Sequence, residues 1–130
     1  MKGVYVLVIS INHNVTSVIG ALGPVSFGKG FYAYAGSAQI NLEKRLARHL
    51  RTSKKKFWHI DYLLNNAGVS VSKIFTLKAE KTQECRLAAL LSQKGSPVLG
   101  FGCSDCKCSS HLFKIEDYEF LKERMQESIV

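Results

Sequence analysis

The sequence contains no apolar run long enough to cross a bilayer, which takes about 20 predominantly apolar residues. Its N-terminal apolar stretch, Val4 to Ile11, is short and lacks a small-residue cleavage site, so it does not read as a secretory signal. Internal repeats, low-complexity segments and linkers are also missing. These absences predict one folded domain over residues 1–130, located in the cytoplasm.

Acidic side chains are scarce over most of the chain. Residues 1–115 carry 16 basic and 5 acidic side chains, a net charge of +11, whereas residues 116–130 carry 2 basic and 5 acidic, a net charge of −3. From Lys44 to Lys56, seven cations occur in thirteen residues with no acid among them. Such a stretch attracts polyanions, although a solvated surface helix can carry the same charges. The cations that we expect to contact nucleic acid are Lys44, Arg48, Arg51, Lys54, Lys55 and Lys56.

Hydrophobic residues make up 46% of the chain, enough for a core without disulfide support. Three segments are expected to be strands: Val4–Ile11, which is rich in β-branched and aromatic residues, Phe31–Gly36, and Val69–Leu77, which shows partial alternation. Asn12-His13-Asn14 suits a turn, so we expect Val15–Gly20 to return as the second strand of a hairpin. Alternation along residues 31–36 would put one set of side chains on a single face: Tyr32, Tyr34 and Gly36.

Helical spacing follows the strand at 31–36. Leu42, Leu46 and Leu50 recur every four residues and predict a buried stripe, with Ser37 or Asn41 as the N-cap. Arg45 and His49 would lie at the rim of that stripe, and Lys44, Arg48 and Arg51 on its far side.

Further helices are expected over residues 57–64, from Thr82 to Gln93, and in the tail over about 116–128. The tail helix rests on the spacing of Tyr118, Leu121, Met125 and Ile129. The pattern as a whole predicts an α/β (α+β) fold with a small, largely antiparallel central sheet flanked by helices.

Two tyrosine motifs and a helix carry a family resemblance. Gly3-Val4-Tyr5 near the start, Tyr34-Ala35-Gly36, and the following helix resemble the GIY-YIG nuclease superfamily, in which the tyrosines lie on neighbouring strands. The helix matches that family at Asn41, Leu42, Arg45, Leu46 and His49. The Cys-rich segment 101–113 is similar to the closing signature of a poorly characterised, mainly archaeal branch, also found fused to DNA-repair glycosylases. The resemblance implies a metal-dependent endonuclease acting on DNA or structured nucleic acid.

The resemblance also implies roles for single residues. Tyr5 would orient or deprotonate the attacking water, Tyr34 would add a hydroxyl near the phosphate, and Arg45 would stabilise the charge that develops there. Gly36 would allow close approach to the backbone, and His49 would relay a proton or hold a phosphate oxygen. Structural alternatives are an ion pair of Arg45 with Glu43 or Asp61, a simple turn glycine, and a half-buried histidine bonded to a carbonyl.

The metal ligand departs from the family pattern. The family's glutamate, which would hold magnesium or manganese, aligns nearer to Ala89, whereas the helix has its carboxylate at Glu84. Glu84 shares a face with Leu87 and Leu91, so it is the candidate ligand, and a first-turn acid favoured by the helix dipole is the alternative. The same departure leaves open a second function, a nucleic-acid-binding module that kept the fold without cleavage.

The Cys-rich segment has three interpretations. Its thiols and imidazole suit zinc, with a compressed ligand set of Cys103, Cys106, Cys108 and His111. A disulfide is the second interpretation, and a tight loop capped by Asp105, with His111 starting a strand, is the third. Cys85, next to Glu84, is expected to pack in the core.

Overall fold

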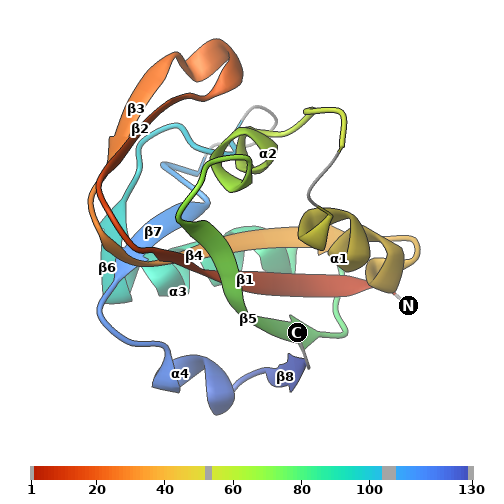
Figure 1. Ribbon diagram of the computed structural model, residues 1–130. Helices are drawn as coiled ribbons and strands as arrows, with labels where there is room; N and C mark the ends of the chain where they lie inside the picture. Colours follow the sequence, from red (N-terminus) through yellow and green to blue (C-terminus); the bar gives the residue numbers. More distant parts are fainter. Residues whose placement is uncertain (1, 52–53, 104–107, 129–130) are drawn as a thin grey trace.

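The computed structural model describes residues 2–51, 54–103 and 108–128. Its centre is a six-stranded antiparallel sheet with the order β6-β7-β4-β1-β5-β8 (Figure 1). The predicted α+β class is thereby confirmed. The strands are β1 Gly3–Ile11, β4 Gly30–Ala38, β5 Val69–Leu77, β6 Gly95–Pro97, β7 Leu112–Ile115 and β8 Gln126–Ser128.

Helices cover both faces of this sheet (Figure 1). The helices are α1 Leu42–Leu50, α2 His59–Leu64, α3 Gln83–Lys94 and α4 Glu119–Lys122. Side chains alternate across β1, so Tyr5 packs in the core on the α1 and α2 side, whereas Val4 and Val6 pack on the α3 and α4 side. The alternation predicted for β4 holds as well, because Tyr32 and Tyr34 share the core of Tyr5. No described helix has the length and apolarity needed to cross a membrane.

The predicted hairpin of Val4–Ile11 with Val15–Gly20 is wrong. Both edges of β1 are already paired, one with β4 and the other with β5. The returning segment, β2 Val15–Val18, therefore pairs with β3 Pro24–Phe27 in a separate two-stranded ribbon, joined by the short helix η1 Gly20–Leu22.

Helix α1 is rotated relative to the predicted stripe. Asn41 caps it in a left-handed conformation, and its Oδ1 accepts a hydrogen bond from the Lys44 amide. Leu42 is buried as expected, but Leu50 is 43% exposed and His49 only 2% exposed. The rotation lets the His49 ring reach the Tyr5 hydroxyl, so a polar contact, rather than the third leucine, completes the buried face.

The predicted tail helix over 116–128 is also wrong. Only one helical turn forms, α4, and β8 then pairs with Ile74–Thr76 of β5. The outer edge of β5 offers backbone donors and acceptors that a strand satisfies and a helix cannot. Leu121 and Met125 are nevertheless buried in the core. The apolar spacing of the tail therefore identifies core residues, although the segment is not one continuous helix. Ile129 lies outside the described residues.

Candidate active site

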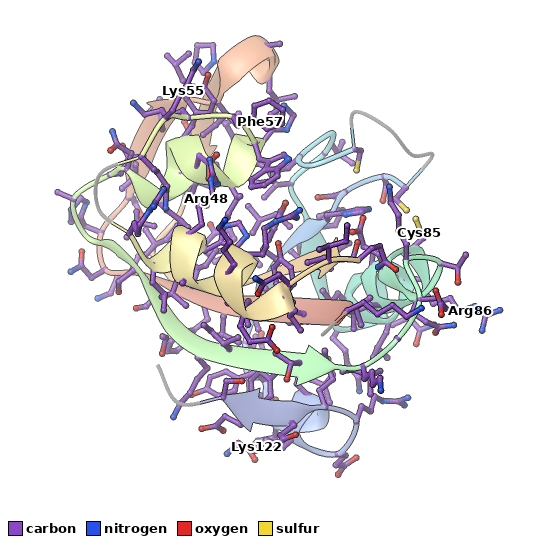
Figure 2. All side chains as sticks on the ribbon, turned by 90° about the vertical axis from the view of Figure 1, so that its right-hand side faces the viewer. Arg48, Lys55, Phe57, Cys85, Arg86 and Lys122 are labelled. Carbon is purple, nitrogen blue, oxygen red and sulfur yellow. The ribbon has the colours of Figure 1, made fainter. Side chains whose placement is uncertain are left out.

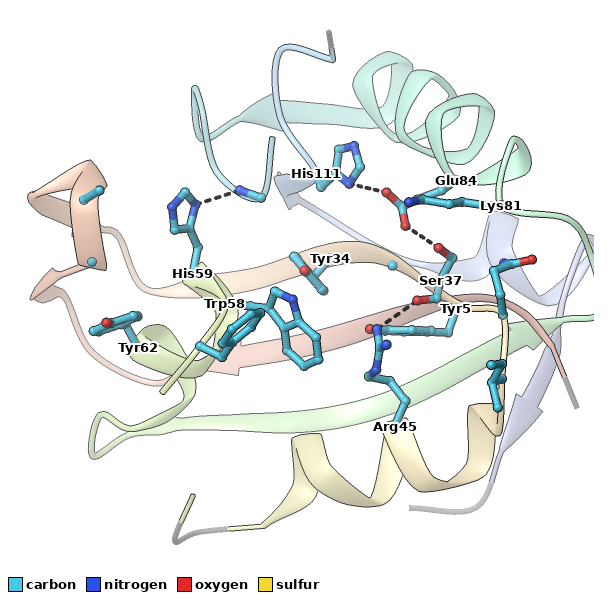
Figure 3. Close-up of a pocket in the computed structure, with 17 residues that line it drawn as sticks. Tyr5, Tyr34, Ser37, Arg45, Trp58, His59, Tyr62, Lys81, Glu84 and His111 are labelled. Atoms are coloured by element: carbon cyan, nitrogen blue, oxygen red, sulfur yellow. Dashed lines mark hydrogen bonds and ion pairs between the residues drawn. The ribbon is translucent and has the colours of Figure 1, made fainter. Parts of the chain in front are cut away.

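The candidate site lies where β4 extends beyond its neighbour β7. These strands pair over Phe31–Tyr34, and the Ala35 amide donates to the His111 carbonyl. Past this point, Gly36–Ala38 pair with β1 on one side and with no described strand on the other. Side chains from both helical layers meet around this open edge in a cavity of about 750 Å³ (Figure 3). Five of the predicted site residues line it: Tyr5, Tyr34, Gly36, Arg45 and Glu84.

His49, the remaining predicted catalytic residue, lies behind Tyr5. Its Nε2 is 2.7 Å from the Tyr5 hydroxyl, and both residues are buried. Burial raises the pKa of Tyr5 to about 12, against the opposing effect of the Arg45 cation. Burial lowers the pKa of His49 to about 4, although the Asp61 carboxylate opposes this shift. At neutral pH the pair is therefore uncharged and joined by one hydrogen bond.

Burial also raises the pKa of Tyr34 well above its usual value. Its ring packs edge-on against His49 and Phe101. Tyr34 therefore contributes a neutral hydroxyl group to the site at neutral pH.

Gly36 is required by the ring of Tyr5. The two residues are directly paired across β1 and β4, and a Cβ at position 36 would lie 2.4 Å from Tyr5 Cζ. The glycine is thus not a simple turn residue, because it lies within β4 and the Tyr5 ring occupies the space that a Cβ would fill.

The Arg45 guanidinium reaches from α1 into the cavity (Figure 3). It lies 4.4 Å from the centre of the Trp58 ring, and its Nη1 donates to the Ser37 carbonyl at 2.9 Å. Among the described residues, no carboxylate forms an ion pair with it. A guanidinium has five N–H donors, so most of its donors are available to an anion in the cavity.

Asp61 instead binds Arg48, which was predicted to contact nucleic acid. Arg48 donates from Nη1 and Nη2 to the two carboxylate oxygens, each at 2.9 Å, and the Phe57 and Trp58 amides donate to Oδ2. Burial alone would raise the pKa of Asp61, but the hydrogen bonds from Arg48 and the two amides lower it below its usual value. This pair, in which Asp61 is buried and Arg48 partly exposed, joins α1 to α2.

The other predicted nucleic-acid contacts divide into two groups. Lys54 donates from Nζ to the carbonyls of Arg48, His49 and Arg51, so it closes the C-terminal end of α1. Four cations are exposed: Lys44, Arg51, Lys55 and Lys56. Lys55 lies at the same end of the molecule as Phe57, whose ring is 75% exposed (Figure 2).

The Glu84 carboxylate faces the cavity from the first turn of α3. Its Oε1 accepts from the Ser37 hydroxyl at 2.6 Å, and its Oε2 lies 3.1 Å from Nδ1 of His111 (Figure 3). Burial alone would raise the pKa of Glu84, but the hydrogen bonds from His111 and Ser37 lower it. Ala89, with which the family glutamate aligns, is exposed.

Most of the other residues that line the cavity were not predicted as site residues, and three of them bear directly on its polar groups. Ser37, considered only as a helix cap, bonds Glu84 with its side chain and Arg45 with its carbonyl. Gln39 lines the cavity with a buried Nε2 that has no described hydrogen-bond partner. His111 belonged to the Cys-rich segment but binds Glu84. Ser37 and Gln39 come just after the Tyr-Ala-Gly motif in the sequence. Their position next to this motif is the signal that could have identified them as site residues.

Among the described thiols, Cys85 and Cys108 lie together with His111. Cys85 is exposed rather than in the core, because it follows Glu84 on α3 and points away from the sheet toward Cys108. Their sulfurs are 2.9 Å apart, and Cys85, Cys108 and His111 place donor atoms within 4.8 Å of one another, so this cluster could hold a metal ion. Cys103 instead lies near the Phe101 carbonyl. Cys106 and Asp105 lie outside the described residues.

A family model described as a domain of unknown function, DUF123, matches residues 4–130. The chain belongs to the DUF123 family. The match spans the central sheet except for the first residue of β1. It also includes the helices, the cavity and the cysteine cluster. No significant match to this DUF123 protein is found among curated proteins or among solved structures.

Proposed function

We propose that this DUF123 protein is a GIY-YIG-type, metal-dependent endonuclease that hydrolyses phosphodiester bonds in DNA or structured nucleic acid. One observation carries the proposal: Tyr5 from β1, Arg45 from α1 and Glu84 from α3 line the same open cavity. A phenol, a guanidinium and a carboxylate are the groups that water attack on a phosphodiester needs.

Arg45 is assigned to the phosphate. The planar fork of a guanidinium can donate two parallel hydrogen bonds to phosphate oxygens. The Trp58 ring and the Ser37 carbonyl hold the guanidinium from two sides, which fixes its position before substrate arrives. The buried Nε2 of Gln39 offers a second donor in the same cavity.

Tyr5 is assigned to the attacking water. A phenol with a pKa of about 12 is a poor source of free phenolate at neutral pH. Burial lowers the pKa of His49 to about 4, so His49 is too weak a base to remove the phenolic proton, and its hydrogen bond at 2.7 Å instead fixes the position of the Tyr5 hydroxyl. Tyr5 would therefore orient the water by a hydrogen bond, and the proton that the water loses would pass to a phosphate oxygen or to solvent.

Glu84 is the assigned ligand for magnesium or manganese. Hard cations prefer carboxylate oxygens, and magnesium is commonly bound through one carboxylate with the remaining positions filled by water and substrate phosphate. Glu84 fits this pattern, since its lowered pKa keeps it ionised and it faces the cavity. When bound, the cation would neutralise charge that develops on the phosphate.

The test is cleavage of labelled single-stranded, duplex and branched DNA and RNA, with and without magnesium or manganese. We expect metal-dependent cleavage that falls about 100- to 1,000-fold in Arg45→Ala, as for the loss of one charge-stabilising donor. Glu84→Gln removes the assigned metal ligand and should therefore lose the metal-dependent cleavage. The matched control is Arg86→Ala, an exposed arginine on α3 outside the cavity. If Arg45→Ala cleaves as well as the parent, the mechanism is wrong.

A second candidate is nucleic-acid binding without cleavage. The observation that favours it is that Glu84 is the single carboxylate among the described residues that line the cavity. This candidate predicts salt-sensitive binding, weakened when the exposed lysines are removed, and no strand scission with any metal.

A further inference from the structure

Two distant segments bring three metal-binding side chains together on the outer side of α3. Cys85 comes from the first turns of that helix, and Cys108 and His111 directly precede β7. Figure 2 shows Cys85 at the surface of the molecule. Their donor atoms all lie within 4.8 Å of one another, close enough for a single ion to bridge them.

The donor chemistry selects a transition metal. Thiolate sulfur and imidazole nitrogen suit zinc, whereas magnesium and calcium require oxygen ligands. Binding would release the two thiol protons to solvent, because the thiolate is the ligand form.

A second, independent feature is the partner of His111. Its Nδ1 lies 3.1 Å from the Glu84 carboxylate, an arrangement in which Nε2 would be the metal ligand. Histidines that bind metals commonly direct their other ring nitrogen to a carboxylate, which fixes the tautomer and ring orientation. His111 is also buried, so the ring is already held in place.

The sulfur positions are compatible with a metal after a small movement. Two thiolates on a tetrahedral zinc, with Zn–S bonds of about 2.3 Å, lie roughly 3.8 Å apart. The observed 2.9 Å requires the sulfurs to separate by less than about 1 Å, and exposed Cys85 has room to do so. The same distance is well beyond a covalent S–S bond of about 2.05 Å.

We propose that Cys85, Cys108 and His111 bind a zinc ion that fastens α3 to the start of β7. Because Cys85 directly follows Glu84, the ion would hold the helical turn that carries the carboxylate of the cavity. The zinc site does not depend on the proposed nuclease activity, and its test uses no nucleic acid.

The test begins with protein produced in zinc-supplemented medium and purified under reducing conditions without an immobilised-metal column. Native mass spectrometry should find one zinc per chain. Competition with a chromophoric chelator should show affinity lower by about 100-fold or more in Cys85→Ser and Cys108→Ser. Cys103→Ser is the matched control and should keep its zinc, since its thiol is outside the cluster. Cobalt in place of zinc should give the intense visible bands of a four-coordinate thiolate site in the parent and lose them in Cys85→Ser.

Glu84→Gln provides a separate readout, because it keeps all three ligands but removes the carboxylate behind His111. We expect zinc affinity to fall about 10- to 100-fold. Circular dichroism checks that each variant is folded. The Cys85→Ser substitution should not disturb the core, because Cys85 is exposed. Three outcomes would overturn the proposal. The parent protein could be free of metal, or Cys85 and Cys108 could form a disulfide in the reduced preparation. In the third outcome, Cys85→Ser keeps its zinc and Cys106→Ser loses it.

Discussion

Tyr5, Gly36 and His49 form a buried unit at the scale of single residues. Gly36 gives room to the Tyr5 ring, and His49 bonds the hydroxyl at its end. The motif residues could be identified from the sequence, since order and spacing along the chain are visible there. Their mutual contacts could not, because cross-strand pairing and the rotation of α1 are set by tertiary packing.

Gly36→Ala should destabilise the fold. The new methyl group would collide with Tyr5 Cζ at 2.4 Å, a contact that the buried ring cannot avoid, so we expect a loss of about 1–3 kcal/mol of unfolding free energy in urea. Gly28→Ala is the control, since its Cβ would meet only the flexible end of Lys114. Equal stability of the two variants would contradict the assigned role of Gly36.

His49 should make stability depend on pH in mildly acidic solution. Its pKa is about 4 in the folded protein against 6.5 in the unfolded chain, so the unfolded state binds more protons between these values. Stability should be complete above about pH 6.5 and fall by roughly 3 kcal/mol as the pH drops to 4. His49→Gln should flatten this slope in urea unfolding at several pH values, and His13→Gln, at an exposed histidine, should keep it.

At the scale of elements, the Arg48–Asp61 pair joins α1 to α2. The strands at 4–11, 31–36 and 69–77 could be predicted from β-branched or aromatic residues and from the alternation of side chains along each segment. The partner of Arg48 could not be predicted, because nothing in the spacing shows that α2 lies beside α1. For the same reason, the basic run could not be divided in advance into structural and solvent-exposed cations.

Asp61→Asn should cost about 1–3 kcal/mol, because it removes the charged partner of the partly exposed Arg48 guanidinium. Glu127→Gln, which breaks the exposed pair with Lys73, should cost less than about 1 kcal/mol. Chemical denaturation at neutral pH compares the two. Similar small losses in both variants would mean that the α1–α2 contact is held by packing alone.

At the scale of the whole molecule, exposed cations lie at both ends, and Lys55 and Lys122 mark these opposite ends in Figure 2. The net charge and its excess over residues 1–115 could be read from the sequence, but the geometry of the surface required the fold. Likewise, Cys85 is separated from Cys108 by 22 residues, so sequence reading favoured a compressed ligand set over this pair.

Nucleic-acid binding should depend on the exposed lysines at the end of the molecule that carries Lys55. A Lys55→Ala/Lys56→Ala double variant should weaken binding similarly across sequences and reduce the slope of log affinity against log salt by about 1 to 2, as expected for two lost phosphate contacts. Lys122→Ala should leave the slope unchanged. Fluorescence anisotropy with a labelled duplex at several salt concentrations measures both. An unchanged slope in the double variant would place the binding surface elsewhere.

Ser37 connects the two helical layers that cover the sheet. Its hydroxyl holds a carboxylate from one helical layer while its carbonyl holds a guanidinium from the opposite layer. The backbone and the side chain of this one residue therefore tie both helical layers to the same strand, and a single position in β4 sets the spacing between the cation and the carboxylate.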